Sequence, residues 1–510
     1  MSSSEAKHGE GLPLSRKVLF SGLSLALFFG LLEAGSLFWE RWDPLPNSTF
    51  PEASRPLPPK EEGEFRVLLY GGSTVAGWPV PEMGFAAQMQ DYLEQIVSGR
   101  RIRLVNYAVS AQPSTYVLRK LNETLAAGDA DAVVVLTAHN EFMLEEDLSV
   151  EDLDRIYAIQ ESLSRLALVR RIRRLLYRVH ISRRSETVMN RLPERVDRNS
   201  PQFRDTVALY ENNLGLIVRL ARGAGVPLFL CTGPANLVDW PPSMEGYPPY
   251  AGIESHRAAV ENLGALLSAA QWQSALAQAE AALVEFPEEA SLHYGAGRAL
   301  MNLGRMEGAH RHFLLASDLD VFPYRALTRF NELIRNMAGR PGVRVVDLAR
   351  VLGERSRYGL PGWEMIFDSV HPSPKGNFLV ATALIDALAR DGLVEFTPPA
   401  EALVSLEDYA ATGDRVARWV AYLLRNARIA MGPPDHHFKS AGRFLERAVH
   451  WDPGNWEVLA NVATLVFLQG DVEAGKVYLE KAARLRGSPI DPGDRELVPY
   501  LKEALEGAGL

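Results

Sequence analysis

Short runs of apolar and β-branched residues recur along this chain, and small or polar residues follow each run directly. The five runs are residues 65–70, 103–107, 130–137, 226–231 and 343–348. Segments with helical patterns separate them, and strands that alternate with helices form a parallel sheet covered on both faces. Such sheets place their active sites beyond the carboxyl ends of the strands. We therefore expect an α/β fold whose polar strand-end residues share one edge.

A serine, a carboxylate and a histidine follow two of these runs. Ser73 comes after two glycines at the end of the first run, and Asp368-Ser-Val-His371 follows the fifth. Serine is a weak nucleophile at neutral pH, so it needs a base within hydrogen-bond reach and a site for the developing oxyanion. The pattern indicates a hydrolytic or acyl-transferring serine enzyme. Taken alone, the segment around Ser73 also fits a strand-to-helix turn with a capping serine.

Two further strand ends extend this pattern. Residues 106–111 follow the second run, and Asn140 follows the third. Together with Ser73 and the Asp368/His371 segment, they resemble the sequence blocks of the SGNH (GDSL-type) hydrolases. The resemblance covers residues 64–245 and 326–396 and implies a flavodoxin-like parallel sheet of about five strands flanked by helices.

The resemblance also implies a role for each residue. Ser73 is expected to attack the acyl carbonyl, His371 to act as general base and then general acid, and Asp368 to hold the imidazole. The oxyanion hole is expected to consist of the N–H groups of Ser73 and Ala111 and the side-chain amide of Asn140.

Three positions depart from the family pattern. Gly72 replaces the aspartate of the family name, Ala111 replaces the usual glycine of the second block, and Ala138 replaces a frequent glycine of the third block. Ala111 can still offer its backbone N–H, but its methyl group restricts the available backbone angles.

Other chemistries lack their sequence signals. His139, His436 and His437 are not accompanied by ligands at zinc spacing, and the only cysteine, Cys231, lies within an apolar run. Gly71 and Gly72 lack the further glycines of a dinucleotide-binding fingerprint. A net charge of −9 gives no reason to invoke nucleic acid. We expect no metal, no cofactor and no nucleic-acid partner.

The N-terminal segment predicts membrane attachment. Residues 18–39 are mostly apolar or small and are long enough to span a bilayer, and Arg16 and Lys17 favour a cytoplasmic N-terminus over residues 1–17. Residues 40–63 contain a proline-rich tether. We expect a single-pass protein of the inner membrane with its catalytic part in the periplasm. A cleaved signal peptide with its cleavage site near Ala34 is the alternative.

Alanines recur at a 34-residue period between the fourth and fifth runs. Ala275 and Ala282 are echoed by Ala309 and Ala316, which resembles tetratricopeptide (TPR) repeats. The pattern returns near the C-terminus at Ala441, Ala448, Gly475 and Ala482. We expect catalytic segments at 64–254 and 326–396, inserted helices at 255–325 and a helical C-terminal region at 397–510. Ordinary alanine-rich helices are the alternative.

The sequence thus predicts a membrane-anchored serine esterase acting on an extracytoplasmic acyl ester. An O-acyltransferase that modifies an envelope glycan is the chemical alternative. A third hypothesis is a TPR scaffold that binds a protein or polymer partner and carries a vestigial serine site.

Overall fold

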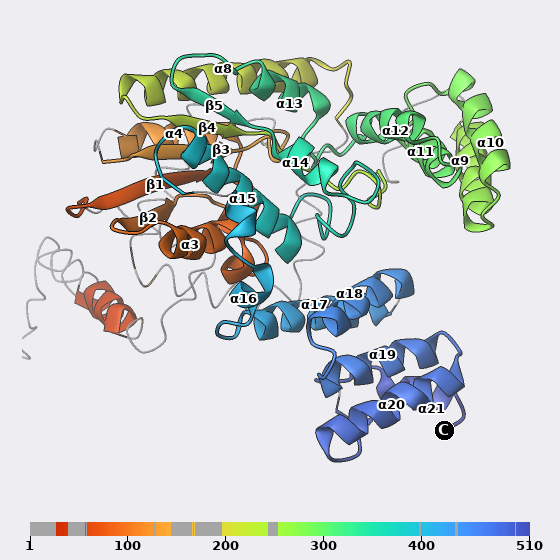
Figure 1. Ribbon diagram of the computed structural model, residues 1–510. Helices are drawn as coiled ribbons and strands as arrows, with labels where there is room; N and C mark the ends of the chain where they lie inside the picture. Colours follow the sequence, from red (N-terminus) through yellow and green to blue (C-terminus); the bar gives the residue numbers. More distant parts are fainter. Residues whose placement is uncertain are drawn as a thin grey trace, which may run out of the picture.

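A parallel sheet lies at the centre of the protein (Figure 1). The computed structural model describes residues 27–38, 57, 59–125, 129–143, 166, 168, 196–242, 253–396, 399–433, 437–494 and 496–510. The five strands have the order β2-β1-β3-β4-β5. Their bounds are β1 Glu64–Gly71, β2 Arg101–Asn106, β3 Ala132–Leu136, β4 Leu228–Cys231 and β5 Val343–Val346. Each predicted run overlaps a strand, and the expected α/β class with a flavodoxin-like sheet is confirmed.

The strand register brings the polar segments to one edge. Gly71 of β1 is paired with Leu136 of β3, Leu136 with Cys231 of β4, and Cys231 with Val346 of β5. All these pairs are parallel, so the chain leaves the four strands at the same level and on the same side. The residues that follow them meet at this edge.

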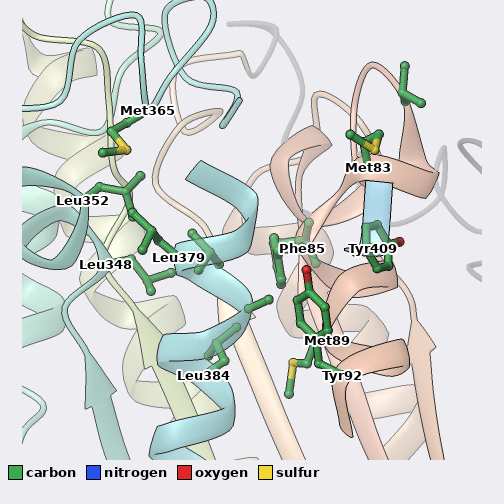
Figure 2. Close-up of a cluster of buried hydrophobic side chains, with 14 of the residues drawn as sticks. Met83, Phe85, Met89, Tyr92, Leu348, Leu352, Met365, Leu379, Leu384 and Tyr409 are labelled. Carbon is green, nitrogen blue, oxygen red and sulfur yellow. The ribbon is translucent and has the colours of Figure 1, made fainter. Parts of the chain in front are cut away.

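Helices cover both faces of the sheet and bury its side chains. On one face lie α3 (Phe85–Ile96), α14 (Leu348–Glu354) and α15 (Pro374–Arg390). On the other lie α4 (Ser114–Leu125), α8 (Pro201–Gly223) and α13 (Thr328–Arg335). Figure 2 shows part of the first core, in which Phe85 and Met89 of α3 and Leu379 and Leu384 of α15 are buried. Every strand is therefore held between two layers of helices.

Between β4 and α13 the chain forms four helices that extend to one side of the sheet (Figure 1). They are α9 (Ile253–Ser268), α10 (Trp272–Glu285), α11 (Ala290–Asn302) and α12 (Met306–Asp318). Ala275, Ala282, Ala309 and Ala316 are all buried, as expected for small residues between paired helices. A Cβ at Gly297 would lie 3.0 Å from the ring of Phe313, so α11 and α12 approach closely there. Their likeness to TPR repeats stays a prediction.

The C-terminal region is also helical. Its elements are η2 (Ala400–Ala402), α16 (Leu406–Ala410), α17 (Arg415–Met431), α18 (Phe438–Trp451), α19 (Trp456–Leu468), α20 (Val472–Arg486) and α21 (Leu501–Gly507). Ala441, Ala448 and Ala482 are buried, and a Cβ at Gly475 would lie 2.5 Å from the Phe467 ring. Buried residues of α17 and α18 join the core formed by α3 and α15, whereas α19 to α21 share a separate core.

Only part of the predicted N-terminal span is described. Residues 27–38 are helical, and several of their apolar side chains, such as Leu27 and Phe38, are exposed. Residues 18–26 and 39 lie outside the described residues. Among the described helices, none combines the length and the apolar character that a membrane crossing requires.

Candidate active site

Two glycines place Ser73 directly after β1. A Cβ at Gly71 would lie 2.2 Å from the carbonyl oxygen of Leu136, and a Cβ at Gly72 would lie 2.3 Å from Nδ2 of Asn140. Neither position can accept a side chain without displacing its neighbours. The departure at Gly72 thus has a local reason, because the glycine leaves room for the Asn140 amide. Ser73 is the first residue of the short helix α2 (Ser73–Ala76) and is partly exposed.

Ser73, His371 and Asp368 form one hydrogen-bonded chain. Asp368 Oδ2 lies 2.6 Å from His371 Nδ1, and His371 Nε2 lies 2.7 Å from Ser73 Oγ. Because the carboxylate can only accept, Nδ1 carries the hydrogen and Nε2 is left to accept the hydroxyl proton of Ser73. The three residues predicted from the sequence are brought together in the order that a serine nucleophile needs.

The loop that carries Asp368 and His371 is folded back on itself. Phe367 N–H donates to His371 O at 2.9 Å, and Asp368 Oδ1 accepts from the N–H groups of Val370 and His371 at 2.9 and 2.8 Å. Burial opposes the charge of Asp368, but the positive charge of His371 and these hydrogen bonds outweigh it. The pKa of Asp368 is therefore lowered, and the carboxylate is ionised at neutral pH.

Two distant segments hold this loop from outside. Asn236, after β4, donates from its N–H to Ser369 O at 3.0 Å and from Nδ2 to Ile366 O at 3.1 Å. Arg447, on α18, donates from Nη1 to Phe367 O at 3.3 Å and from Nη2 to Trp363 O at 3.0 Å. The loop that carries Asp368 and His371 is thus held partly by the C-terminal region.

Two alanines with strained backbones lie at the proposed oxyanion hole: Ala111 belongs to it, and Ala138 comes two residues before Asn140. Ala111 has φ 63° and Ala138 has φ 95°, a region that favours glycine. These are two of the positions at which the sequence departs from the pattern that it resembles, with alanine in place of glycine. Each such residue costs about 1–3 kcal/mol unless its surroundings fix it. Asn140 Nδ2 donates to Gln112 O at 3.1 Å, which ties the two segments together.

A buried carboxylate fixes the end of β3. Glu141 accepts hydrogen bonds from Thr137 Oγ1 at 2.8 Å, from Ala138 N–H at 3.2 Å and from Ser114 Oγ at 2.7 Å. Burial raises its pKa despite these donors. The network holds Ala138 in its strained conformation and thereby orients Asn140.

A shallow hollow lies beside Ser73 and encloses about 190 Å³, a volume that includes open solvent. Its lining consists of Gly72, Ser73, Thr74, Leu136, Thr137, His139 and Asn140. Two aromatic rings flank the base: Phe367 lies 5.9 Å from the His371 ring and Trp78 lies 6.4 Å from it, between ring centroids.

Several functional residues were not identified from the sequence. Glu141 follows Asn140 directly and could have been found as a buried acid at a strand end. Arg447 carries no local signal, because its role depends on a contact with a loop 80 residues away. Cys231 is buried as expected, and burial raises the pKa of its thiol. Within the described residues, no group of three or more His, Cys, Asp or Glu side chains could hold a metal ion.

Comparison with known proteins gives structural likenesses only. No protein-family model matches this sequence, and no curated protein matches it. The solved structure of TesA is 13% identical with a TM-score of 0.29 and covers 64% of this chain and 98% of its own. An acetyl xylan esterase is 12% identical with a TM-score of 0.30, covering 64% of this chain and 100% of its own.

The lipase/acylhydrolase from Enterococcus faecalis is 11% identical with a TM-score of 0.31 and covers 66% of this chain and 99% of its own. At such identities and TM-scores, a functional conclusion has to come from the residues of the site itself.

Proposed function

We propose that this protein is a serine-dependent ester hydrolase that removes a short acyl group from its substrate. The observation that carries the proposal is the unbroken hydrogen-bond chain from Ser73 through His371 to Asp368 beside a small pocket. A vestigial site on a binding scaffold would not need to keep these three side chains at hydrogen-bonding distance, so the chain of hydrogen bonds favours an enzyme.

In the proposed reaction, His371 Nε2 takes the hydroxyl proton of Ser73 while Oγ attacks the ester carbonyl. The negative charge that develops on the carbonyl oxygen is stabilised by the N–H groups of Ser73 and Ala111 and by the amide of Asn140. His371 then gives the proton to the leaving alcohol, and Asp368 stabilises its transient positive charge. Water repeats these steps on the acyl-enzyme and releases the acid.

Acyl transfer to a glycan remains the second candidate, favoured by one feature. The ring of Trp78 is partly exposed and lies beside His371, where an incoming sugar hydroxyl would have to be deprotonated. Aromatic faces suit the apolar faces of sugars as well as acyl chains. A sugar hydroxyl would then replace water in the second half of the reaction.

Turnover of a panel of acyl esters by the purified protein, with and without sugar acceptors, tests this proposal. We expect the short acyl esters to be cleaved, Ser73 to be labelled by a fluorophosphonate, and Ser73→Ala to lose turnover by at least about a thousandfold. Ser369→Ala, in the same loop as His371, is the matched control and should retain activity. Undiminished turnover by Ser73→Ala would remove the mechanism.

We further propose that the substrate is extracytoplasmic and that residues 18–39 anchor the protein to the inner membrane. The apolar character of this segment and the preceding Arg16 and Lys17 support the proposal. Full-length protein should stay in the membrane fraction after carbonate washing, whereas a chain that begins at Glu64 should not. A shortened native protein in the soluble fraction would indicate cleavage of a signal peptide instead.

A further inference from the structure

His139 and Asn140 are neighbours in sequence but diverge at the end of β3. The amide of Asn140 donates to Gln112 O. The imidazole of His139 instead lies against the segments that carry Gly233 and Ala326, on the β4 side of the site. Both residues line the pocket that contains Ser73. The lining of the pocket therefore includes both an amide and an imidazole.

The hydrogen bond to Ala326 fixes the tautomer of His139. The N–H of Ala326 donates to His139 Nδ1 at 3.2 Å, so Nδ1 is an acceptor and the ring hydrogen lies on Nε2. The residue is only 6% exposed. Burial, with a smaller effect from the positive charge of His371, lowers the pKa of His139 to about 3. The ring is neutral at physiological pH and presents one N–H donor.

This donor has no acceptor in the part of the chain that the structure describes. His139 Nε2 is buried and makes no hydrogen bond there. A Cβ at Gly233 would lie 3.1 Å from both Nε2 and Cε1, so the absence of a side chain at Gly233 makes room for this edge of the ring. Buried donors are rarely left without a partner, because the hydrogen bonds to water that they lose on burial would not be replaced. An orphaned N–H in the lining of a reaction pocket points to an acceptor on the substrate.

The tetrahedral intermediate determines which part of the substrate meets this donor. Its central carbon carries Ser73 Oγ, the oxyanion, the alcohol oxygen and the acyl substituent. Asn140 serves the oxyanion, and His371 serves the alcohol oxygen because it exchanges a proton with it. We infer that the acyl substituent takes the remaining direction, toward Leu136, Thr137 and His139 in the lining of the pocket.

We propose that His139 Nε2–H binds an oxygen atom carried by the acyl group, and that the enzyme selects short hydroxyacyl or alkoxyacyl esters over alkyl esters of the same size. The inference rests on the proposed esterase function and defines its substrate class. A site that donates a hydrogen bond discriminates against an analogue without the acceptor, because the buried donor is then left unpaired.

Two p-nitrophenyl esters form a matched pair for the test. Methoxyacetate and butyrate have acyl chains of the same length and differ by one oxygen in place of one methylene group. The ratio of their kcat/KM values is divided by the ratio of their rates of hydrolysis by hydroxide. This normalised ratio is corrected for the different intrinsic reactivity of the two esters. We expect this normalised ratio to favour methoxyacetate by roughly tenfold in the wild type, the typical effect of one neutral hydrogen bond.

His139→Phe should reduce the normalised ratio to about one, and His139→Gln, which keeps a donor, should retain part of it. Ser317→Ala is the matched control. Like His139 Nε2, the Ser317 hydroxyl is buried without a partner among the described residues, but it belongs to α12 and is not part of the pocket lining. A purely structural role of His139 would change the rates of both esters equally. A ratio near one in the wild type, or an unchanged ratio in His139→Phe, overturns the inference.

A second readout does not depend on turnover. In Ser73→Ala with ¹⁵N-labelled histidine, the Nε2–H resonance of His139 should shift with saturating methoxyacetate ester and not with butyrate ester. Equal shifts with both esters, or no shift with either, contradict the role of His139. Failure of a fluorophosphonate to label wild-type Ser73 would instead contradict the esterase proposal, so the two failures can be told apart.

Discussion

The inserted helices α9–α12 fill a core of their own, whereas the C-terminal helices α17 and α18 complete the core on one face of the sheet. The insert contacts the catalytic segments through bonds such as Tyr294 Oη–H to Val238 O at 2.9 Å. In the C-terminal region, Trp419 packs on Phe367 at 5.3 Å, and Arg447 bonds two carbonyls of the catalytic loop. Position in sequence is therefore a poor guide to which helical region serves the active site.

The sequence alone connects the insert, rather than the C-terminal region, with the active site. The insert interrupts the catalytic segments and leaves from the edge of the sheet that carries Ser73, so its place in the sequence predicts a role in substrate selection, and this stays a prediction. The C-terminal region follows the last catalytic segment, and its sequence predicts only that it is helical. Its helices α17 and α18 lie against the loop with Asp368 and His371. We therefore expect changes in the C-terminal helices to affect the active site more strongly than changes in the insert.

Deletion should separate the two regions most clearly. Removal of residues 397–510 would expose the core residues that contact Trp419 and Leu423, and we expect a protein that neither folds nor reacts with a fluorophosphonate. Replacement of residues 255–316 by a flexible linker should leave a folded protein that hydrolyses small esters normally. Circular dichroism and the rate of Ser73 labelling measure both outcomes. A folded, reactive protein without residues 397–510 would refute the comparison.

Single buried aromatics offer a finer version of this test. Trp419 and Phe313 are both almost fully buried, and truncation of either to alanine should cost about 3–5 kcal/mol. We expect Trp419→Ala to lower the stability of the catalytic unit, followed by the loss of Ser73 labelling during urea unfolding. Phe313→Ala should loosen only α9–α12, so that labelling persists after the insert has unfolded. If Ser73 labelling were lost at the same urea concentration in the two variants, the insert and the catalytic unit would not be separate.

Arg447→Met tests the link to the catalytic loop directly. The change leaves the carbonyls of Trp363 and Phe367 without their donor while keeping a long apolar side chain. We expect kcat for a small ester to fall about tenfold, equivalent to about 1.4 kcal/mol, with KM little changed. Arg443→Met is the matched control, because Arg443 lies 4.8 Å from the same Trp363 ring without bonding the loop carbonyls. Equal losses in both variants would assign the effect to Trp363.

The smallest expected effect is a pH dependence of the insert. His293 and His312 lie with their Nδ1 atoms 3.0 Å apart. Burial lowers the pKa of both, with His293 and Arg311 lowering that of His312 further and Glu289 opposing the shift at His293. Because the folded state favours the neutral rings, stability is complete above pH about 6.5 and is lost as the pH falls below it.

The loss should be about 1 kcal/mol or less at pH 5.5, since the partly exposed His312 ring is screened by solvent. Hydrogen exchange should then rise in α11 and α12 more than in α17. In the double variant His293→Gln and His312→Gln, hydrogen exchange of α11 and α12 should be the same at pH 5.5 as above pH 6.5. Exchange in α11 and α12 that does not change with pH would contradict this assignment.

The sequence predicts those parts of the structure that depend on local signals. The apolar runs, the glycines before Ser73 and the spacing of Asp368 and His371 are readable because each concerns neighbouring residues. At Ala111 the methyl group was expected to restrict the backbone, yet the residue adopts a positive φ that favours glycine. The orphaned donor of His139 was not predictable, because it depends on the N–H of Ala326, which is distant in sequence.

The contacts of Arg447 and Trp419 were not predictable for the same reason. Both lie on amphipathic helices whose buried face is clear from the sequence, but the pattern does not say which surface covers it. Only the assembled structure shows that this surface includes Phe367, next to the catalytic carboxylate.

Hydrogen exchange of residues 362–372 tests most directly whether the C-terminal helices, rather than the insert, hold the catalytic loop. It should be measured in the wild type, in Arg447→Met and in the protein with residues 255–316 replaced by a linker. We predict faster exchange of this loop in Arg447→Met and wild-type exchange in the protein without the insert. Wild-type exchange in Arg447→Met, or equally fast exchange when the insert is removed, would contradict the account.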